Sequence, residues 1–137
     1  MSRMMPSSTR EIITPNNDLL NISRRFNIPH SPGIRANGFI FLSGMIAIDP
    51  VTGERKHGTI EEEARQILEN ITHMLESAGS SRAKVVRILV MLTDIEKWGA
   101  VNEIYREYFP HEPPARSAIG VALNNGMKIE IECTALE

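Results

Sequence analysis

One long amphipathic helix constrains the fold of this 137-residue chain more than any other feature. Thr59 and Glu62 have the spacing of a capping box, in which each side chain accepts a hydrogen bond from the other residue's backbone N–H group. Gly79 is where the helix should end, because glycine readily adopts the left-handed conformation of a helix terminus. Between these ends, apolar residues recur at helical spacing: Ile60, Ala64, Ile67, Leu68, Ile71, Met74, Leu75 and Ala78. Such a helix has one apolar face, which a second layer of structure must cover.

Strand-like segments on both sides of this helix supply the second layer. Residues 34–36 and 39–43 flank Asn37-Gly38, a pair that tolerates the positive φ angles of a tight hairpin turn. Residues 85–92 are rich in β-branched and aliphatic side chains, so we expect a strand that is buried on most of both faces.

A second, shorter helix is expected after these strands. Asp94 can cap its beginning, and Pro110 ends it because proline cannot continue a helix. Its apolar stripe consists of Trp98, Val101, Ile104, Tyr105 and Tyr108.

The N-terminal part of the chain is less regular. We expect a flexible tail over residues 1–10, a short strand over 11–14 and one or two helical turns over 18–26. Residues 11–137 are predicted to form a single α+β domain, in which two helices pack on one face of a mixed sheet.

The end of the chain predicts a second hairpin, with strands over about 115–123 and 127–136 joined by Asn124-Asn125-Gly126. A three-residue loop would pair Ile119 with Ile131 and place the apolar side chains of both strands on one face. We expect this register, because a two-residue loop would divide the apolar side chains between the two faces.

The opposite face of this hairpin would then hold Arg116 and Glu130 among small side chains. A guanidinium in such a place can hold a carboxylate through two parallel hydrogen bonds, each worth roughly 1.5 to 3 kcal/mol when partly desolvated. The pattern leaves two interpretations open: a site for a carboxylate ligand, or an internal ion pair of Arg116 with Glu130 or Glu132.

Charge and composition argue against several classes of function. The formal net charge is −2 at pH 7 and no basic stripe is present, so nucleic acid is not an expected partner. No segment approaches the roughly 20 apolar residues of a membrane span, and the first residues do not read as a signal peptide, which predicts a cytoplasmic protein. The four histidines are scattered, so no metal is expected, and the single cysteine, Cys133, is expected to be a buried thiol.

The motifs Pro114-Ala115-Arg116-Ser117 and Ile129-Glu130-Ile131-Glu132 resemble the signature of the Rid family, the reactive intermediate deaminases also called the YjgF family. The resemblance covers about residues 34–136. It implies a chorismate-mutase-like α+β fold, assembled as a homotrimer with sites in the clefts between subunits. It also implies hydrolysis of imines and enamines to the keto acid and ammonia, without a cofactor.

The resemblance also assigns roles to individual residues. Arg116 matches the arginine that holds the substrate carboxylate, and Glu130 matches the glutamate that orients or activates water. Ser43 and Asn102 fall at positions that line the same pocket, although both residue types often make only local hydrogen bonds.

The chain departs from the family pattern at two positions of the site. His30 stands where typical members have a tyrosine, and it either closes the pocket or remains an exposed loop residue. Ala118 stands where many members have cysteine, which enlarges the cavity. The segment over residues 16–26 is longer than usual and is expected to act as a lid that selects the substrate.

The predicted function is therefore deamination of a small carboxylate-bearing 2-imino or 2-enamino acid. The alternative is a trimeric binding or regulatory protein that uses Arg116 to hold a carboxylate metabolite without turnover. A different reaction on the same fold, such as chorismate rearrangement, is less favoured, because it would need several cations around a dicarboxylate.

Overall fold

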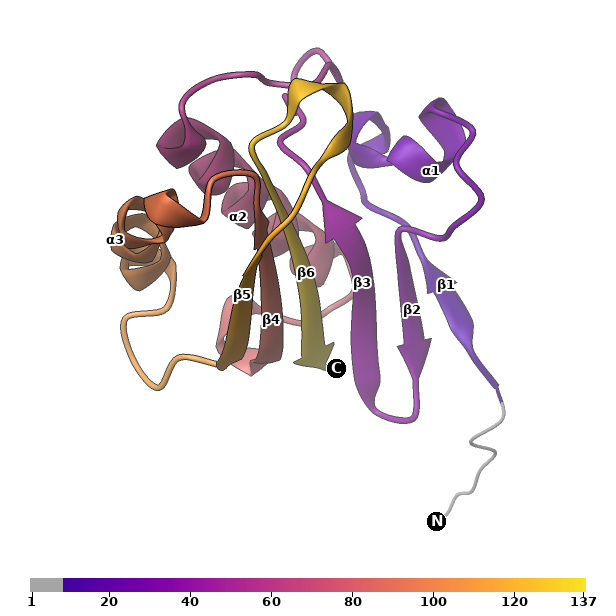
Figure 1. Cartoon of the computed structure of the whole chain (residues 1–137). Coiled ribbons are helices and arrows are strands. Elements are labelled where there is room, and N and C mark those ends of the chain that lie inside the picture. Colours follow the sequence, from indigo (N-terminus) through magenta and orange to yellow (C-terminus); the bar gives the residue numbers. More distant parts are fainter. Residues whose placement is uncertain (1–8) are drawn as a thin grey trace.

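The computed structural model describes residues 9–137, so most of the predicted tail over 1–10 lies outside the described residues. Six strands form one sheet (Figure 1): β1 Glu11–Ile13, β2 Gly33–Ala36, β3 Phe39–Met45, β4 Val85–Leu92, β5 Ala115–Gly120 and β6 Ile129–Leu136. The α-helices are α1 Ile22–Arg25, α2 Ile60–Ser77 and α3 Trp98–Tyr108. Short 3-10 turns lie at Asp18–Leu20, Arg82–Lys84, Ile95–Lys97 and Asn124–Gly126.

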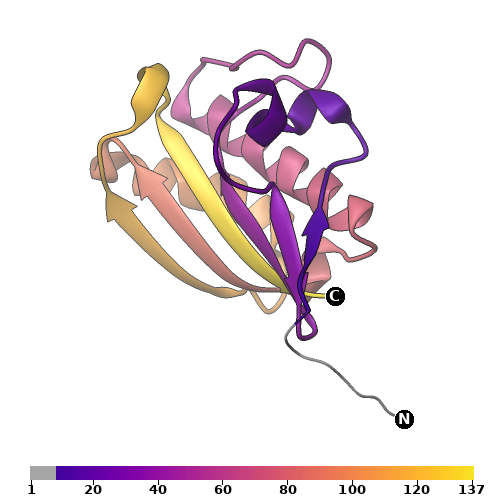
Figure 2. The ribbon, with the colours of Figure 1, turned by 90° about the vertical axis from the view of Figure 1, so that its right-hand side faces the viewer.

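The sheet is mixed, with the strand order β1-β2-β3-β6-β4-β5. Neighbouring strands are antiparallel except β4 and β5, which run parallel. Parallel strands need a crossover connection, and α3 supplies it by returning the chain from the end of β4 to the start of β5. Helices α2 and α3 pack on one face of the sheet (Figure 2), which confirms the predicted α+β class.

Helix α2 forms as its sequence predicts. Thr59 Oγ1 accepts a hydrogen bond from the Glu62 backbone N–H at 3.1 Å, and Glu62 Oε1 accepts one from the Thr59 N–H at 2.8 Å. All eight predicted apolar positions of the helix are buried. Their burial against the sheet forms the centre of the core, because an apolar stripe gains free energy in proportion to the area it removes from water.

The local predictions for the first half of the chain are also confirmed. β2 and β3 form the expected hairpin, and Asn37 and Gly38 in its turn have φ angles of 51° and 85°. The short first strand is present, and the region over 18–26 contains a 3-10 turn followed by α1.

The predicted final hairpin is wrong. β5 and β6 do not pair with each other, because β4 lies between them and pairs with both. Val90 of β4 is aligned with Ala118 on one side and Ile131 on the other, whereas Met91 is aligned with Ile119 and Glu130. Ile119 therefore lies on the opposite face from Ile131 and is 43% exposed, not packed in the core as predicted.

Two smaller predictions of burial are also wrong. β4 is buried only on the side that faces the helices, while Val86 and Arg87 are exposed. Trp98, assigned to the apolar stripe of the second helix, is the first residue of α3 and is 52% exposed.

The face of the sheet away from α2 and α3 carries exposed apolar side chains. The strand register places five of them there: Ile12, Phe39, Phe41, Ile119 and Leu136. Within residues 9–137, no helix is both long and apolar enough to cross a membrane.

Candidate functional site

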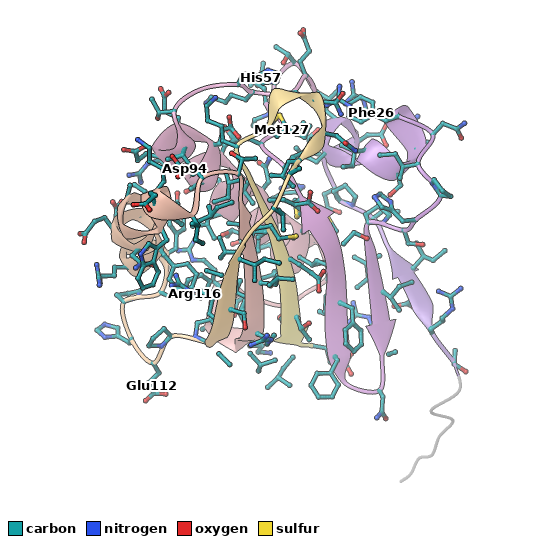
Figure 3. All side chains as sticks on the ribbon, in the orientation of Figure 1. Phe26, His57, Asp94, Glu112, Arg116 and Met127 are labelled. Atoms are coloured by element: carbon teal, nitrogen blue, oxygen red, sulfur yellow. The ribbon has the colours of Figure 1, made fainter. Side chains whose placement is uncertain are left out.

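Arg116 lies on the edge strand β5, on the side of the sheet that faces the helices. Its strand neighbour is the fully buried Ile88, and its guanidinium carbon lies 4.8 Å from the centre of the Tyr105 ring of α3. A cation over an aromatic face is attracted by the quadrupole of the neutral ring, whose face is electron-rich, so Tyr105 holds Arg116 in place. Figure 3 shows Arg116 at this edge, between β5 and α3.

Asn102 and Arg116 line the same surface pocket. This pocket, which we call the arginine site, has a volume of about 260 Å³. It is lined by Asn102, Tyr105, Arg106, Phe109, Pro113, Pro114 and Arg116. Ala118 follows Arg116 two residues along β5, on the same face, and packs against the core, not in this pocket.

Tyr105 contributes a buried polar atom to the arginine site. Its hydroxyl has no hydrogen-bond partner among the described residues. Burial raises the pKa of Tyr105 to about 12, although the nearby charge of Arg116 opposes this shift. The ring therefore remains neutral at physiological pH and acts as an apolar support for the guanidinium.

Glu130 does not share a face with Arg116, which corrects the sequence prediction. The alignment of Glu130 with Met91 places its side chain on the face away from α2 and α3, whereas Arg116 points toward them. No carboxylate of residues 9–137 lies within ion-pair distance of Arg116. The predicted alternative, an ion pair of Arg116 with Glu130 or Glu132, is therefore wrong within one chain.

Glu130 lines a different cavity, together with His30 and Gly44. This cavity, the glutamate cavity, has a volume of about 340 Å³. Its lining residues are Ile22, Phe26, Ile28, His30, Gly44, Ile46, Arg55, Ala122, Leu123, Asn124, Asn125 and Glu130. Phe26, one of them, lies at the side of the molecule opposite Arg116 in Figure 3. The predicted site residues of this chain thus fall into two separate groups, Asn102 and Arg116 in the arginine site and His30 and Glu130 in the glutamate cavity.

A β-bulge brings Gly44 against Glu130. The register between β3 and β6 shifts between Leu42 and Met45, so Ser43 and Gly44 lie in the irregular stretch. A Cβ atom added at Gly44 would overlap the Glu130 carboxylate. Glycine is therefore the residue that leaves room for this carboxylate at the bulge.

The Glu130 carboxyl is partly withdrawn from water. Burial raises its pKa above the ordinary value, and the negative charge of Glu132 raises it further, while the nearby His30 lowers it. A carboxyl group with a raised pKa exchanges a proton more readily near neutral pH, which suits general acid–base chemistry.

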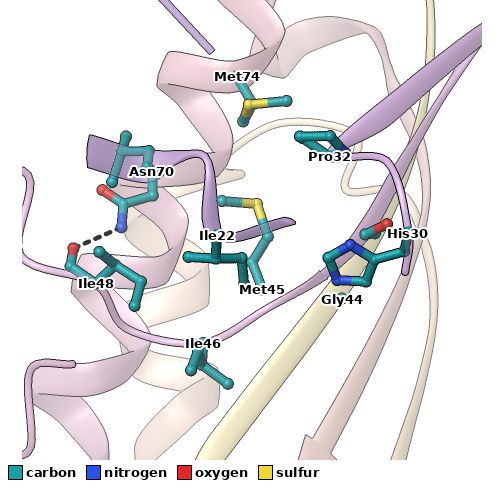
Figure 4. Close-up of a pocket in the computed structure, with 11 residues that line it drawn as sticks. Ile22, His30, Pro32, Gly44, Met45, Ile46, Ile48, Asn70 and Met74 are labelled. Atoms are coloured by element: carbon teal, nitrogen blue, oxygen red, sulfur yellow. Dashed lines mark hydrogen bonds between the residues drawn. The ribbon is translucent and has the colours of Figure 1, made fainter. Parts of the chain in front are cut away.

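His30 and Ser43 lie on the same side of the fold as Glu130. The ring of His30 is exposed, and its Nδ1 lies 2.7 Å from Ser23 Oγ of α1. Ser43 Oγ donates a hydrogen bond to the Ser31 carbonyl at 2.6 Å, so its proton already serves a local contact. Figure 4 shows His30 beside Gly44 at an adjoining pocket that shares Ile22 and Ile46 with the glutamate cavity.

Several residues of these sites had not been predicted from the sequence. Phe26 lies at the end of α1 and Arg55 in an isolated β-bridge with Ile48, and no motif marks either position. Tyr105 was predicted only as a core residue, and the importance of Gly44 appears only when β6 lies beside it. Arg116 and Glu130 were marked by the Pro-Ala-Arg-Ser and Ile-Glu-Ile-Glu motifs, and Ser43, Asn102, His30 and Ala118 by their positions relative to the family pattern.

No group of three or more His, Cys, Asp or Glu residues within 9–137 is close enough to hold a metal ion. Cys133 is buried, as predicted, and burial raises the pKa of its thiol to about 12.

Residues 24–137 match the family model described as endoribonuclease L-PSP. This chain belongs to the Rid family. Among Rid relatives, the RutC family protein of Pyrococcus horikoshii is 44% identical over 108 residues, which cover 78% of this chain and 86% of that protein. The human 2-iminobutanoate/2-iminopropanoate deaminase is 41% identical over 110 residues, which cover 80% of each protein.

The fold also matches solved structures of Rid proteins. The crystal structure of YyfA, a member of the conserved Rid family from Yersinia pestis, aligns with a TM-score of 0.85 and 36% identity. The alignment covers 94% of this chain and all of that one. This chain therefore has the YjgF-type fold of the Rid family, a six-stranded mixed sheet with two helices.

Proposed function

We propose that this protein hydrolyses 2-imino or 2-enamino acids to the 2-keto acid and ammonia, at sites formed between the copies of a homotrimer. The observation that carries the proposal is that Arg116 has no carboxylate partner within residues 9–137 and points away from the face that holds Glu130. The relatives named as deaminases of 2-iminobutanoate and 2-iminopropanoate support the choice of reaction.

Arg116 binds the substrate carboxylate in this proposal. Its guanidinium is positioned by Tyr105 in a half-buried setting, where charge-assisted hydrogen bonds to a carboxylate are stronger than in water. Asn102 adds a neighbouring amide on α3, and Ala118 keeps the strand surface beside Arg116 small.

Glu130 activates water for the same substrate. As a carboxylate it accepts a proton from water while the oxygen attacks the carbon of the C=N bond, and the proton then passes to the nitrogen. Glu130 next takes the hydroxyl proton of the resulting carbinolamine and passes it to the amino nitrogen, so that the C–N bond breaks, ammonia leaves, and the C=O bond of the keto acid forms. A positioned proton acceptor and donor of this kind contributes about 100- to 10,000-fold to a rate. No cofactor takes part in this route.

His30 lines the glutamate cavity, and Ser43 lines the adjoining pocket. His30 is close enough to lower the pKa of Glu130, and it lines the same cavity. Ser43 serves mainly to position the bulge, because its hydroxyl donates to the Ser31 carbonyl.

A second copy of the chain is needed to bring Arg116 to Glu130. The exposed apolar side chains on the open sheet face, among them Phe41 and Ile119, support burial of this face between copies. A closed ring of three copies would pair each arginine site with the glutamate cavity of a neighbour. The cytoplasmic location predicted from the sequence stays a prediction.

Complementation between inactive variants tests both the reaction and the arrangement. Arg116→Ala and Glu130→Gln are each expected to abolish the acceleration of ammonia release from 2-iminopropanoate, generated in situ by an amino-acid oxidase, over its spontaneous hydrolysis. Chains of the two variants, unfolded together and reassembled, should recover about one quarter of the wild-type activity, because random mixing leaves that share of sites with both residues intact.

The control mixes Arg116→Ala with a chain that carries both substitutions, which leaves no intact site. Recovery only in the first mixture supports sites between copies. If the wild type is active but the first mixture recovers no activity, the sites do not lie between copies. If the wild type binds 2-keto acids but never accelerates ammonia release, the protein is a binding protein.

A further inference from the structure

Arg55 is a second arginine whose setting calls for an anionic partner. Its guanidinium carbon lies 4.5 Å from the centre of the Phe26 ring, and its Nε is buried without a hydrogen-bond partner among the described residues. No carboxylate of residues 9–137 lies within ion-pair distance of it. A buried donor on a cation is costly to leave unsatisfied.

The neighbouring Arg25 shows what a structural arginine looks like in this region. Arg25 also lies over the Phe26 ring, at 5.3 Å, but its Nη1 donates hydrogen bonds to the carbonyls of Leu19 at 3.0 Å and Gly53 at 2.6 Å. These bonds tie the α1 segment to the turn before α2. Arg25 therefore has a role in the fold, whereas the contacts of Arg55 leave its Nε donor unused.

Arg55 lines the same cavity as Glu130 and His30. The remaining wall combines the apolar side chains of Ile22, Phe26, Ile28, Ile46 and Leu123 with Asn124 and Asn125, so a ligand there would remove part of the guanidinium from water. Arg55 and Glu130 are not paired with each other. The cavity thus offers a reacting carboxyl group and a separate cation, with a volume of about 340 Å³.

We propose that Arg55 binds a second carboxylate, on the side chain of the substrate, so that the preferred substrates are 2-imino dicarboxylates. This inference rests on the proposed function, in which Arg116 of another copy holds the first carboxylate. The flat face of Phe26 keeps the guanidinium of Arg55 in one orientation, which reduces the entropy lost when two parallel hydrogen bonds form.

Two substrates of equal chain length test this specificity: 2-iminoglutarate, with a terminal carboxylate, and 2-iminopentanoate, with a terminal methyl group. Both are generated in situ by amino-acid oxidases, and kcat/KM is measured for wild type, Arg55→Met and Arg24→Met. Met keeps the unbranched stem of arginine. Arg24 is the matched control, because it is exposed, pairs with Asp18 and does not line the cavity.

Wild type and Arg24→Met should prefer 2-iminoglutarate by about tenfold or more. In Arg55→Met, kcat/KM for 2-iminoglutarate should fall by about 10- to 100-fold, which corresponds to the loss of one to two charge-assisted hydrogen bonds. The kcat/KM for 2-iminopentanoate should fall by less than about twofold. Equal activity on both substrates in wild type, or an unchanged ratio in Arg55→Met, would overturn the role of Arg55 and leave the deaminase proposal intact.

Binding of the two keto acids by calorimetry separates this inference from the reaction itself. 2-Oxoglutarate should bind wild type more tightly than 2-oxopentanoate, and Arg55→Met should remove the difference. If wild type binds the two equally, the inference fails whether or not turnover is seen. If the difference is present but no imine is hydrolysed, Arg55 binds the second carboxylate and only the proposed reaction fails.

Discussion

The Arg116 guanidinium rests on the ring of Tyr105, at 4.8 Å from its centre, while the Tyr105 hydroxyl is buried without a hydrogen-bond partner within residues 9–137. The ring and the hydroxyl of one residue therefore have opposite effects. The ring supports the cation that we propose as the carboxylate anchor, and the hydroxyl adds an unsatisfied group to the core.

Substitutions at Tyr105 should separate these effects. Tyr105→Phe keeps the ring, so we expect kcat/KM within about twofold of wild type and a melting temperature that is equal or higher. Tyr105→Leu removes the cation–π contact and should raise KM by about 2- to 30-fold, with a smaller change in kcat. Steady-state kinetics and thermal unfolding check both variants. An equal loss of kcat/KM in Tyr105→Phe and Tyr105→Leu would show that the hydroxyl, not the ring, contributes to the site.

The charge of Glu132 should control the pH dependence of activity through Glu130. Because Glu132 is one of the causes that raise the pKa of Glu130, Glu132→Gln should lower that pKa. The active carboxylate form of Glu130 would then persist to lower pH, and the acidic limb of the kcat/KM profile should move toward lower pH. Glu76→Gln removes an equal charge from the exposed side of α2 and should leave the limb in place. A limb that does not move in Glu132→Gln would show that another group controls it.

Gly44→Ala should reduce activity without unfolding the protein. The added methyl group overlaps the Glu130 carboxylate, whose flexible side chain can turn aside at little cost in stability. Displacement of a proton-transfer group commonly lowers a rate by about 100-fold, so kcat should fall by that order while the urea midpoint changes little. Wild-type kcat in Gly44→Ala would contradict the assignment of Glu130 as the group that activates water.

Glu63 should be the most important carboxylate for stability in the described part of the chain. It is fully buried in α2, and its Oε1 accepts a hydrogen bond from the Lys128 backbone N–H at 2.9 Å, two residues before Glu130. Glu63→Ala should lower the free energy of unfolding by about 2 to 3 kcal/mol, because the bond is lost and the donor stays unsatisfied. Urea denaturation measures this change, and Glu61→Ala, on the exposed side of the same turn, should cost less than about 0.5 kcal/mol. A loss at Glu63 no larger than at Glu61 would show that the contact adds no net stability.

The elements whose signals are local could be predicted from the sequence. The capping box at Thr59, the apolar period of α2 and the Asn37-Gly38 turn each act over a few residues, so each could be read directly. Arg116 and Glu130 could be recognised for the same reason, because each lies in a short motif of consecutive residues. Arg55 was not marked, because nothing in its own segment indicates that Phe26 and Glu130 line the same cavity.

The sequence by itself determined the helices, most of the strands and the family of this protein. Only the tertiary structure decided which strands are neighbours. The crossover by α3 makes β5 pair in parallel with β4, and β6 takes the other side of β4. This arrangement turns Arg116 and Glu130 to opposite faces, although a hairpin would have joined them. Pairing between strands distant in the chain depends on how whole layers pack, and periodicity within one strand contains no information on which neighbour it will have.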